Sequence, residues 1–175
     1  MSTPKDSVII LGIDPGTRIT GYGIIAVERG GIKALDFGCI RPPPSLSLYE
    51  RYAALYDGIN HLIEKFNPSA VAVETQFVHK NIQIALKLGM ARGSVLIPAA
   101  KKNIPIFEYA PRKAKLAVVG NGAATKEQVQ KMIQRLLALP SIPPEDAGDA
   151  LAIALCHAHT LSFSQKIIGS KCLST

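Results

Sequence analysis

The sequence predicts one mixed-sheet α/β domain, and three observations support this fold class. The first part of the chain contains β-branched apolar runs separated by turn signals. These runs predict an antiparallel meander of three strands over 8–13, 21–27 and 32–40. Beyond residue 44, segments with helical spacing of apolar residues alternate with two further short apolar runs. A length of 175 residues, of which 47% are hydrophobic, is enough to bury a substantial core in one unit.

Short turns separate the first three strands. The run 8–13 ends in the Asp-Pro-Gly sequence 14–16, which turns the chain sharply. The glycine pair 30–31 is a hairpin signal between the second and third strands. Three consecutive prolines at 42–44 then end this part of the sheet.

A helix, a strand and a second helix are expected next. Ser47 and the glutamate three residues later have capping-box spacing, and apolar residues at helical intervals predict a helix over 48–66. The almost wholly apolar run 70–74 predicts a central strand buried on both faces. A helix over 82–100 follows, and we expect Pro98 to kink it or end it early.

The remaining elements are a fifth strand and two helices. The strand is expected over 104–109, and a second capping box begins a helix over 125–139. A proline at the first position begins the last helix, over 144–161. We therefore expect a single domain over residues 1–161, and a mobile tail over 162–175, where packing signals are few.

The composition indicates which kind of partner and which cellular compartment to expect. Lysine and arginine number 20 against 13 acidic residues, and the resulting charge of +7 favours a polyanionic partner such as nucleic acid. The three cysteines are widely spaced without a CxxC pair, so we expect reduced thiols. Cys156 lies close to His157 and His159, but the Ala-rich and Leu-rich run around them predicts a packed helix. No signal-peptide pattern or membrane-spanning run is recognisable, so we expect a cytoplasmic protein.

Four acidic residues stand at the ends of predicted elements. Asp14 ends the first strand and Glu74 ends the fourth, and sites form at such strand ends in open α/β sheets. Asp146 and Asp149 are three residues apart on one face at the start of the last helix. Taken singly, each has an ordinary explanation as a turn residue, a strand-end charge or a favourable charge at a helix N-terminus.

Taken together, the four acids predict a metal site. If they converge, protonation or bound cations must relieve their mutual repulsion. Ligands that are all oxygen atoms favour Mg²⁺ or Mn²⁺ over zinc. Two such ions, roughly 4 Å apart, can hold the attacking and leaving oxygens of a phosphodiester hydrolysis. That reaction leaves 5′-phosphate and 3′-hydroxyl ends without a covalent enzyme intermediate.

Several sequence blocks, in this order and spacing, resemble the RuvC family of Holliday junction resolvases. The blocks are LGIDPGTR with TGYG in 11–23, VE with a phenylalanine in 73–77, ALKLGMARG in 85–93, FEYAPR in 107–112, VVGNG in 118–122 and DAGDALAIA in 146–154. The resemblance covers about residues 8–161. It implies an RNase H-like fold, a mixed five-stranded sheet flanked by helices.

The resemblance also implies an activity and its partners. Family members are Mg²⁺-dependent endonucleases of recombination and DNA repair that make paired, symmetric nicks in four-way DNA junctions. Asp14, Glu74, Asp146 and Asp149 fall on the family's metal-binding acids, although some members have histidine at the position of Asp146. Two ions per subunit are expected, with Mn²⁺ able to substitute. The chain is expected to form a homodimer through the helix containing 82–92 and to work with the branch-migration proteins RuvA and RuvB.

Five further residues are candidate DNA contacts. Phe77 matches an aromatic residue that stacks on a base near the crossover, although an apolar residue just past a strand is more commonly part of the core. Lys115 and Lys126 match basic residues needed for handling DNA. Arg92 and Arg112 belong to the basic residues that concentrate in the second half of the chain. Contacts of this kind with phosphates make binding strongly dependent on salt.

Two other functions share part of this sequence pattern. An actin-like or Hsp70-like ATPase also uses an Asp-Pro-Gly type of turn, but it needs two related domains, more than 175 residues can supply. A junction-binding protein without catalysis would gain nothing from four carboxylates near phosphate. Nicking of a four-way junction with and without Mg²⁺ distinguishes all three functions.

Overall fold

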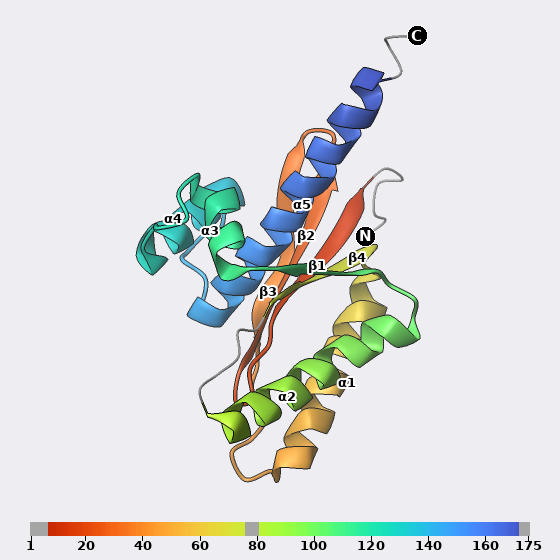
Figure 1. The fold of residues 1–175 in the computed structure, drawn as a ribbon, viewed down its shortest axis with the longest axis vertical. Helices are drawn as coiled ribbons and strands as arrows, with labels where there is room; N and C mark the ends of the chain where they lie inside the picture. The colour runs from red at the N-terminus through yellow and green to blue at the C-terminus, as the bar shows by residue number, and fades with distance from the viewer. Residues whose placement is uncertain (1–6, 76–80, 172–175) are drawn as a thin grey trace.

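Five strands form a single mixed sheet in a computed structural model, which describes residues 7–75 and 81–171 (Figure 1). The strand order is β3-β2-β1-β4-β5. The strands are β1 (Val8–Asp14), β2 (Thr20–Glu28), β3 (Gly31–Ile40), β4 (Ala70–Glu74) and β5 (Ile106–Tyr109). The helices are α1 (Leu48–Phe66), α2 (Ile82–Lys101), α3 (Pro111–Val119), α4 (Lys126–Leu136) and α5 (Glu145–Lys171).

The register of the strands aligns several of their ends along one edge. β1, β2 and β3 form the predicted antiparallel meander, whereas β4 runs parallel to β1, and β5 runs parallel to β4. Within these pairs, β1 ends where β2 begins, β2 begins where β3 ends, and β4 and β5 end together. We call this the carboxyl edge, and its residues in spatial order are Ile40, Thr20, Asp14, Glu74 and Tyr109.

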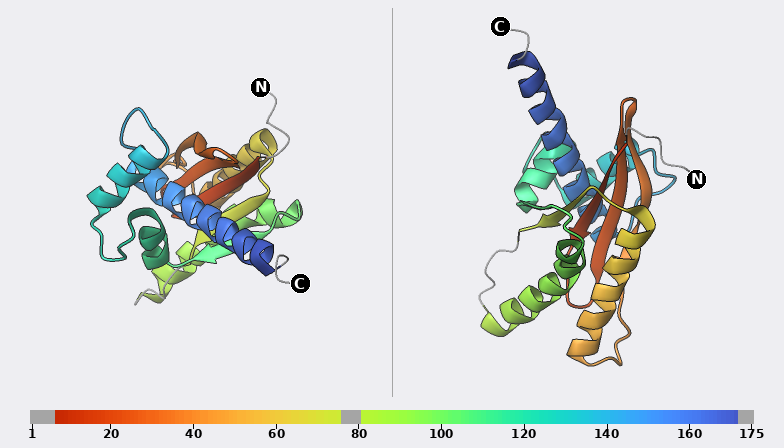
Figure 2. Two further views of the ribbon diagram at one scale, coloured as in Figure 1. Left: turned by 90° about the horizontal axis from the view of Figure 1, so that it is seen from above. Right: turned by 90° about the vertical axis from the view of Figure 1, so that its right-hand side faces the viewer.

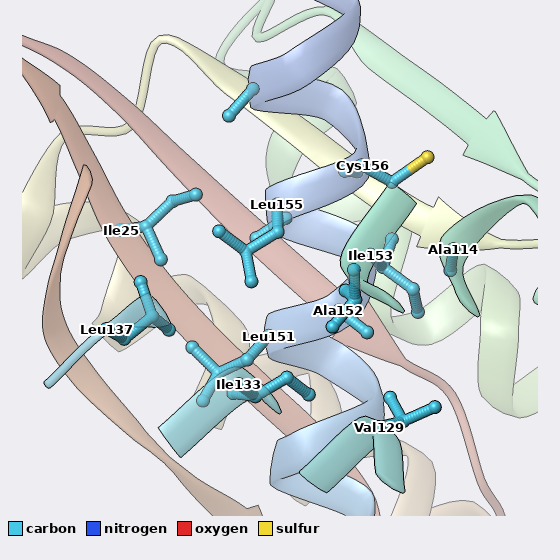
Figure 3. Close-up of a cluster of buried hydrophobic side chains, with 14 of the residues drawn as sticks. Ile25, Ala114, Val129, Ile133, Leu137, Leu151, Ala152, Ile153, Leu155 and Cys156 are labelled. Atoms are coloured by element: carbon cyan, nitrogen blue, oxygen red, sulfur yellow. The ribbon is translucent and has the colours of Figure 1, made fainter. Parts of the chain in front are cut away.

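Helices cover both faces of the sheet. α1 and α2 pack together on one face, and α5 crosses the other face with α3 and α4 beside it (Figures 1 and 2). Side chains alternate along β1, so Leu11 joins the buried cluster beneath α1 and α2, while Ile10 joins the cluster beneath α5. In that second cluster, Leu151 and Leu155 of α5 face the sheet, as Figure 3 shows.

Local signals set most helix ends. Both predicted capping boxes are confirmed: the Ser47 hydroxyl accepts from the Glu50 amide at the start of α1, and Thr125 and Gln128 form the equivalent pair at α4. The Asn81 side chain caps α2 by accepting from two backbone amides of its first turn. In the described part of the chain, no helix is long and apolar enough to cross a membrane.

The structure corrects four details of the predicted elements. α3 was not predicted at all, and α4 ends at Leu136 instead of residue 139. α5 continues to Lys171, so the predicted end of the last helix at residue 161 was wrong. Pro98 does not end α2 early, because it lies within the last turn, where losing one amide hydrogen bond interrupts little further helix.

Candidate active site

Two glycines bring the start of α5 against the sheet beside Asp14. Gly21 of β2 pairs with Asp14 of β1, and a Cβ atom on Gly21 would lie 2.0 Å from the backbone oxygen of Asp146. A Cβ atom on Gly12 would lie 2.1 Å from the backbone oxygen of Ala150. A larger residue at either position would push α5 away from the strands, so the sequence uses glycine to place the α5 acids near the β1 acid.

Asp14 and Glu74 lie side by side at the carboxyl edge. They end neighbouring parallel strands, and their side chains share a hydrogen bond. Burial, together with the negative charges of Glu74, Asp149 and Asp146, raises the pKa of Asp14 from 3.8 to about 8. Three of the predicted acids therefore lie near enough to the fourth to raise its pKa.

Lysines partly compensate two of the acids. Burial raises the pKa of Glu74, although Lys126 and Lys115 oppose this rise. Burial also raises the pKa of Asp149, and the ion pair between Lys126 Nζ and Asp149 Oδ2, at 3.1 Å, opposes it. The lysines therefore offset part of the pKa rise of Glu74 and Asp149, whereas every cause that shifts the pKa of Asp14 raises it.

A pocket of about 220 Å³ opens between these groups. It is lined by Glu74, Pro111, Ala114, Lys115, Lys126, Val129, Asp149, Ala152 and Ile153. Lys126 also contacts Glu145, and although burial lowers the pKa of Lys126, its hydrogen bonds to Glu145 and Asp149 raise that pKa overall. Lys126 is therefore fully protonated at neutral pH and stands next to the acids.

The donor set fits a hard divalent cation. All four acids offer only oxygen atoms, and neighbouring negative charges help to raise the pKa of Asp14, Glu74 and Asp149, a repulsion that a cation would relieve. Among the described residues, no three acidic, histidine or cysteine side chains already surround a single point closely enough to hold a metal ion. Asp149 is turned to Lys126, so binding an ion would require Asp149 to exchange that partner for the metal.

The other sequence-predicted residues lie in several places. Lys115 and Lys126 line the pocket. Arg92 lies on α2, where its guanidinium is mostly buried and 2.8 Å from Glu108, and Arg112 is exposed on the first turn of α3. Neither arginine lines the pocket, so their roles as DNA contacts stay predictions. Phe77 lies outside the described residues.

The histidine near the end of the predicted core helix is packed in the interior. His157 is buried, its Nδ1 lies 2.7 Å from the Tyr109 hydroxyl, and its ring stacks on Phe107 with 4.2 Å between centroids. Burial lowers the pKa of His157. The prediction of a packed helix at Cys156 and His157 is confirmed.

Sequence reasoning missed two contributors to this end of the molecule. α3 supplies one wall of the pocket through Ala114, and its signals were a proline at the first position and Gly120 in the left-handed conformation at its end. A second hollow, of about 600 Å³, lies beyond the meander and is lined by Arg18, Ile19, Arg41, Pro42, Pro44 and Arg51. Its arginines are far apart in the sequence and outside the basic second half.

Sequence comparison identifies close relatives. The profile of the family described as "Crossover junction endodeoxyribonuclease RuvC" matches residues 10–157. A protein of that name from Protochlamydia amoebophila is 60% identical over 88% of this chain and 92% of its own length. Another from Legionella pneumophila (strain Philadelphia 1) is 48% identical over 93% of this chain and 94% of its own.

Structural comparison agrees. The structure titled "T. thermophilus RuvC in complex with Holliday junction substrate" matches with a TM-score of 0.84 and 34% identity, over 90% of this chain and 96% of that one. A second structure of Thermus thermophilus RuvC gives a TM-score of 0.81 and 35% identity, over 90% and 97% of the two chains. These matches confirm the predicted RNase H-like fold.

Proposed function

The chain belongs to the RuvC family of crossover junction endodeoxyribonucleases, and from this membership we propose that it resolves four-way DNA junctions by paired hydrolysis of phosphodiester bonds. As a member of this family it is a metal-dependent nuclease that acts in recombination and repair. The observation that carries the proposal is the convergence of half-buried Asp14, Glu74 and Asp149 beside two lysines at the carboxyl edge.

We assign the metal-binding role to the four acids. Asp14, Glu74, Asp146 and Asp149 would hold two Mg²⁺ ions per subunit, with Mn²⁺ able to substitute. Bound divalent ions supply an activated water and stabilise the departing 3′ oxygen, which leaves a 5′-phosphate. The chain supplies a half-buried set of carboxylates, and the mutual repulsion that helps to raise their pKa values favours the binding of cations.

The lysines contribute to DNA binding. Lys115 and Lys126 line the same pocket as Glu74 and Asp149, where they would contact a phosphate that enters the acidic site. Lys126 also forms an ion pair with Asp149. If a metal ion bound to Asp149, the Lys126 ammonium group would be free to contact an incoming phosphate instead. Phe77, Arg92 and Arg112 remain predicted DNA contacts.

A homodimer is part of the same proposal. Two coordinated nicks need two active sites, which a two-fold dimer supplies. An exposed apolar stripe supports an interface on α2, because Ile82, Leu86, Met90 and Ile97 recur at helical spacing and Ile82 and Leu86 are 75% and 64% exposed. We further propose that the dimer works in the cytoplasm with RuvA and RuvB.

The test is nicking of a synthetic four-way junction with and without Mg²⁺. We expect nicks at symmetric positions only when the metal is present, with ends that DNA ligase can seal because they carry 5′-phosphate and 3′-hydroxyl groups. A linear duplex of the same sequence is the control and should stay intact. Binding without nicking would instead favour a junction-binding protein, and ATP hydrolysis would favour the ATPase.

A further inference from the structure

Two loops carry arginines to the carboxyl edge on the side of Asp14 away from the lysines. Arg18 lies in the loop between β1 and β2, and Arg41 directly follows β3. Because the strand order is β3-β2-β1, the chain at Arg41 is about two strand spacings, roughly 10 Å, from the chain at Asp14. The acids are therefore flanked on the β4 side by the pocket that Glu74 shares with Lys115 and Lys126, and on the β3 side by arginines.

The arginines share one hollow. Arg18 and Arg41 line the hollow of about 600 Å³ together with Arg51 from α1, and Pro42 and Pro44 complete its wall. We call it the arginine pocket. Its volume exceeds that of a single water site and leaves room for a phosphate group between the guanidinium groups.

The pocket is held in place before anything binds. The buried Thr20 hydroxyl donates to the Gly16 carbonyl at 3.1 Å and accepts from the Gly16 amide at 3.3 Å, which closes the loop that carries Arg18. Arg51 donates from Nε to the Leu46 carbonyl at 3.0 Å and from a terminal nitrogen to the Pro44 carbonyl. These bonds fix both loops, so little ordering is needed on binding.

The charges in the arginine pocket are uncompensated. Arg18 and Arg41 are exposed, and within the described part of the chain neither forms a hydrogen bond or ion pair. Several lysines elsewhere on the surface do have acidic partners: Lys33 lies 2.7 Å from Glu28, and Lys102 lies 3.1 Å from Glu64. Guanidinium groups with free donors bind phosphate oxygens in pairs, and the pocket contains no acidic residue that would repel the phosphate.

We propose that the arginine pocket binds a backbone phosphate of the junction DNA, a few nucleotides from the phosphate that is cut. The proposal rests on the proposed function and adds a contact on the β3 side of the acids. Lys115 and Lys126 then hold the DNA on one side of Asp14 and the arginine pocket holds it on the other. Two fixed points on opposite sides set the position of the strand along the carboxyl edge.

The experiment measures junction affinity against salt for the full chain. Arg18→Ala combined with Arg41→Ala removes two charges from the pocket, and fluorescence anisotropy with a labelled four-way junction, without divalent metal, reports binding alone. Arg29→Ala is the matched control, because Arg29 is an exposed arginine at the β2–β3 turn, at the opposite end of the sheet. A combined Arg18→Lys and Arg41→Lys variant keeps the charge but loses the paired donors.

A lost phosphate contact has a defined signature. The slope of log affinity against log salt should fall by about 0.9 for each phosphate lost, so affinity near 0.1 M salt should drop by about tenfold per contact. The Arg29→Ala control should stay within about twofold of the wild type, and the double lysine variant should keep the slope. Equal melting temperatures of the double alanine variant and the wild type show that the fold is unchanged.

The outcomes separate the two proposals. Wild-type protein that neither binds nor nicks the junction contradicts the proposed function. Wild-type protein that does both, while the double alanine variant binds with the same affinity and slope, contradicts only the arginine pocket. A loss of affinity with an unchanged slope also contradicts it, because a phosphate contact must release counterions.

Discussion

The lysines on one side of the acids and the arginines on the other side differ in whether acidic residues already neutralise their charge. Lys126 is paired with Asp149 and Glu145, so part of its charge stabilises the acids themselves. Arg18 and Arg41 have no such partner among the described residues. The comparison teaches that residues of the same charge, on different sides of the metal site, should affect different measurements. The lysine side should affect the chemistry, and the arginine side should affect only how the DNA is held.

The largest effect is expected at the acids between the two groups. Asp14→Asn, Glu74→Gln and Asp149→Asn should each reduce nicking by more than the roughly 10–100-fold that an outer partner of a metal ligand costs, because each removes a ligand. Junction binding should change little, since affinity comes from phosphate contacts. Asp146→Asn should impair nicking less. Gel assays of nicking and of binding check both parts, and near-normal nicking by any of the first three would show that the acids are wrongly assigned.

Replacing Lys126 tests the comparison directly. Lys126→Gln removes the charge that opposes the raised pKa of Glu74 and Asp149, so both acids should ionise at higher pH. Since a metal ligand must be deprotonated, the acidic limb of the pH profile of nicking should move to higher pH. The profile of Arg18→Ala should keep its shape. If both variants shift alike, or neither shifts, the two basic groups do not differ in the way described.

The contact between β2 and α5 predicts a smaller, mixed effect. Gly21→Ala places a methyl group against the Asp146 backbone, which should cost about 1–3 kcal/mol of folding stability as overpacking does. Nicking should fall further than this stability loss explains, because Asp146 and Asp149 move away from Asp14. Gly30→Ala is the control, with nothing within 4 Å of its added methyl group. Thermal melting and nicking rates measured below the melting range distinguish the two contributions.

The smallest effect concerns stability against pH. The pKa of Asp14 is raised from 3.8 to about 8 in the folded protein, so the folded state holds a proton that the unfolded state releases. Stability is therefore lost as pH rises between these values, and Asp14→Asn avoids the loss. Without metal, the melting temperature of Asp14→Asn should exceed that of the wild type by at least about 3 °C at pH 8, the effect of about 1 kcal/mol in a domain of this size.

A lower pH provides the control for this comparison of the wild type with Asp14→Asn. At about pH 3 the two proteins should melt at nearly the same temperature, because this pH lies below 3.8 and Asp14 is then protonated in the folded state and mostly so in the unfolded state. Adding Mg²⁺ at pH 8 should narrow the difference, since the wild type alone keeps all the ligands. A wild type that is the more stable of the two at pH 8 without metal would contradict the raised pKa.

The sequence was sufficient to predict the strands and the acids, because both depend on local signals. β-Branched runs marked β1 to β3, capping boxes marked α1 and α4, and each acid stood at the end of an apolar element. α3 was missed because a nine-residue helix carries too few periodic positions to be recognised. The arginine pocket was missed because its members are distant in the sequence, and only the antiparallel register of β2 and β3 brings Arg18 and Arg41 together.

The ion pair between Lys126 and Asp149 could not be predicted either. The resemblance implied that both residues handle metal or DNA, but their mutual contact depends on the angle at which α4 approaches α5. Helix packing angles follow from side-chain surfaces that short motifs do not describe. The sequence alone therefore predicts which residues form the site, whereas their pairing follows from tertiary structure.

The glycine contacts between the strands and α5 have a consequence for hydrogen exchange. β1 and α5 contain several almost fully buried residues, including Leu11, Ile13, Leu151 and Ile153, and the close approach at Gly21 packs the two elements together at Asp14 and Asp146. Segments packed in this way exchange their amide protons only when the whole molecule unfolds. The amides around Gly12 and Ala150 should therefore exchange together, at the slowest rate in the chain. The spacing of the four carboxylates would then be kept until the whole molecule unfolds.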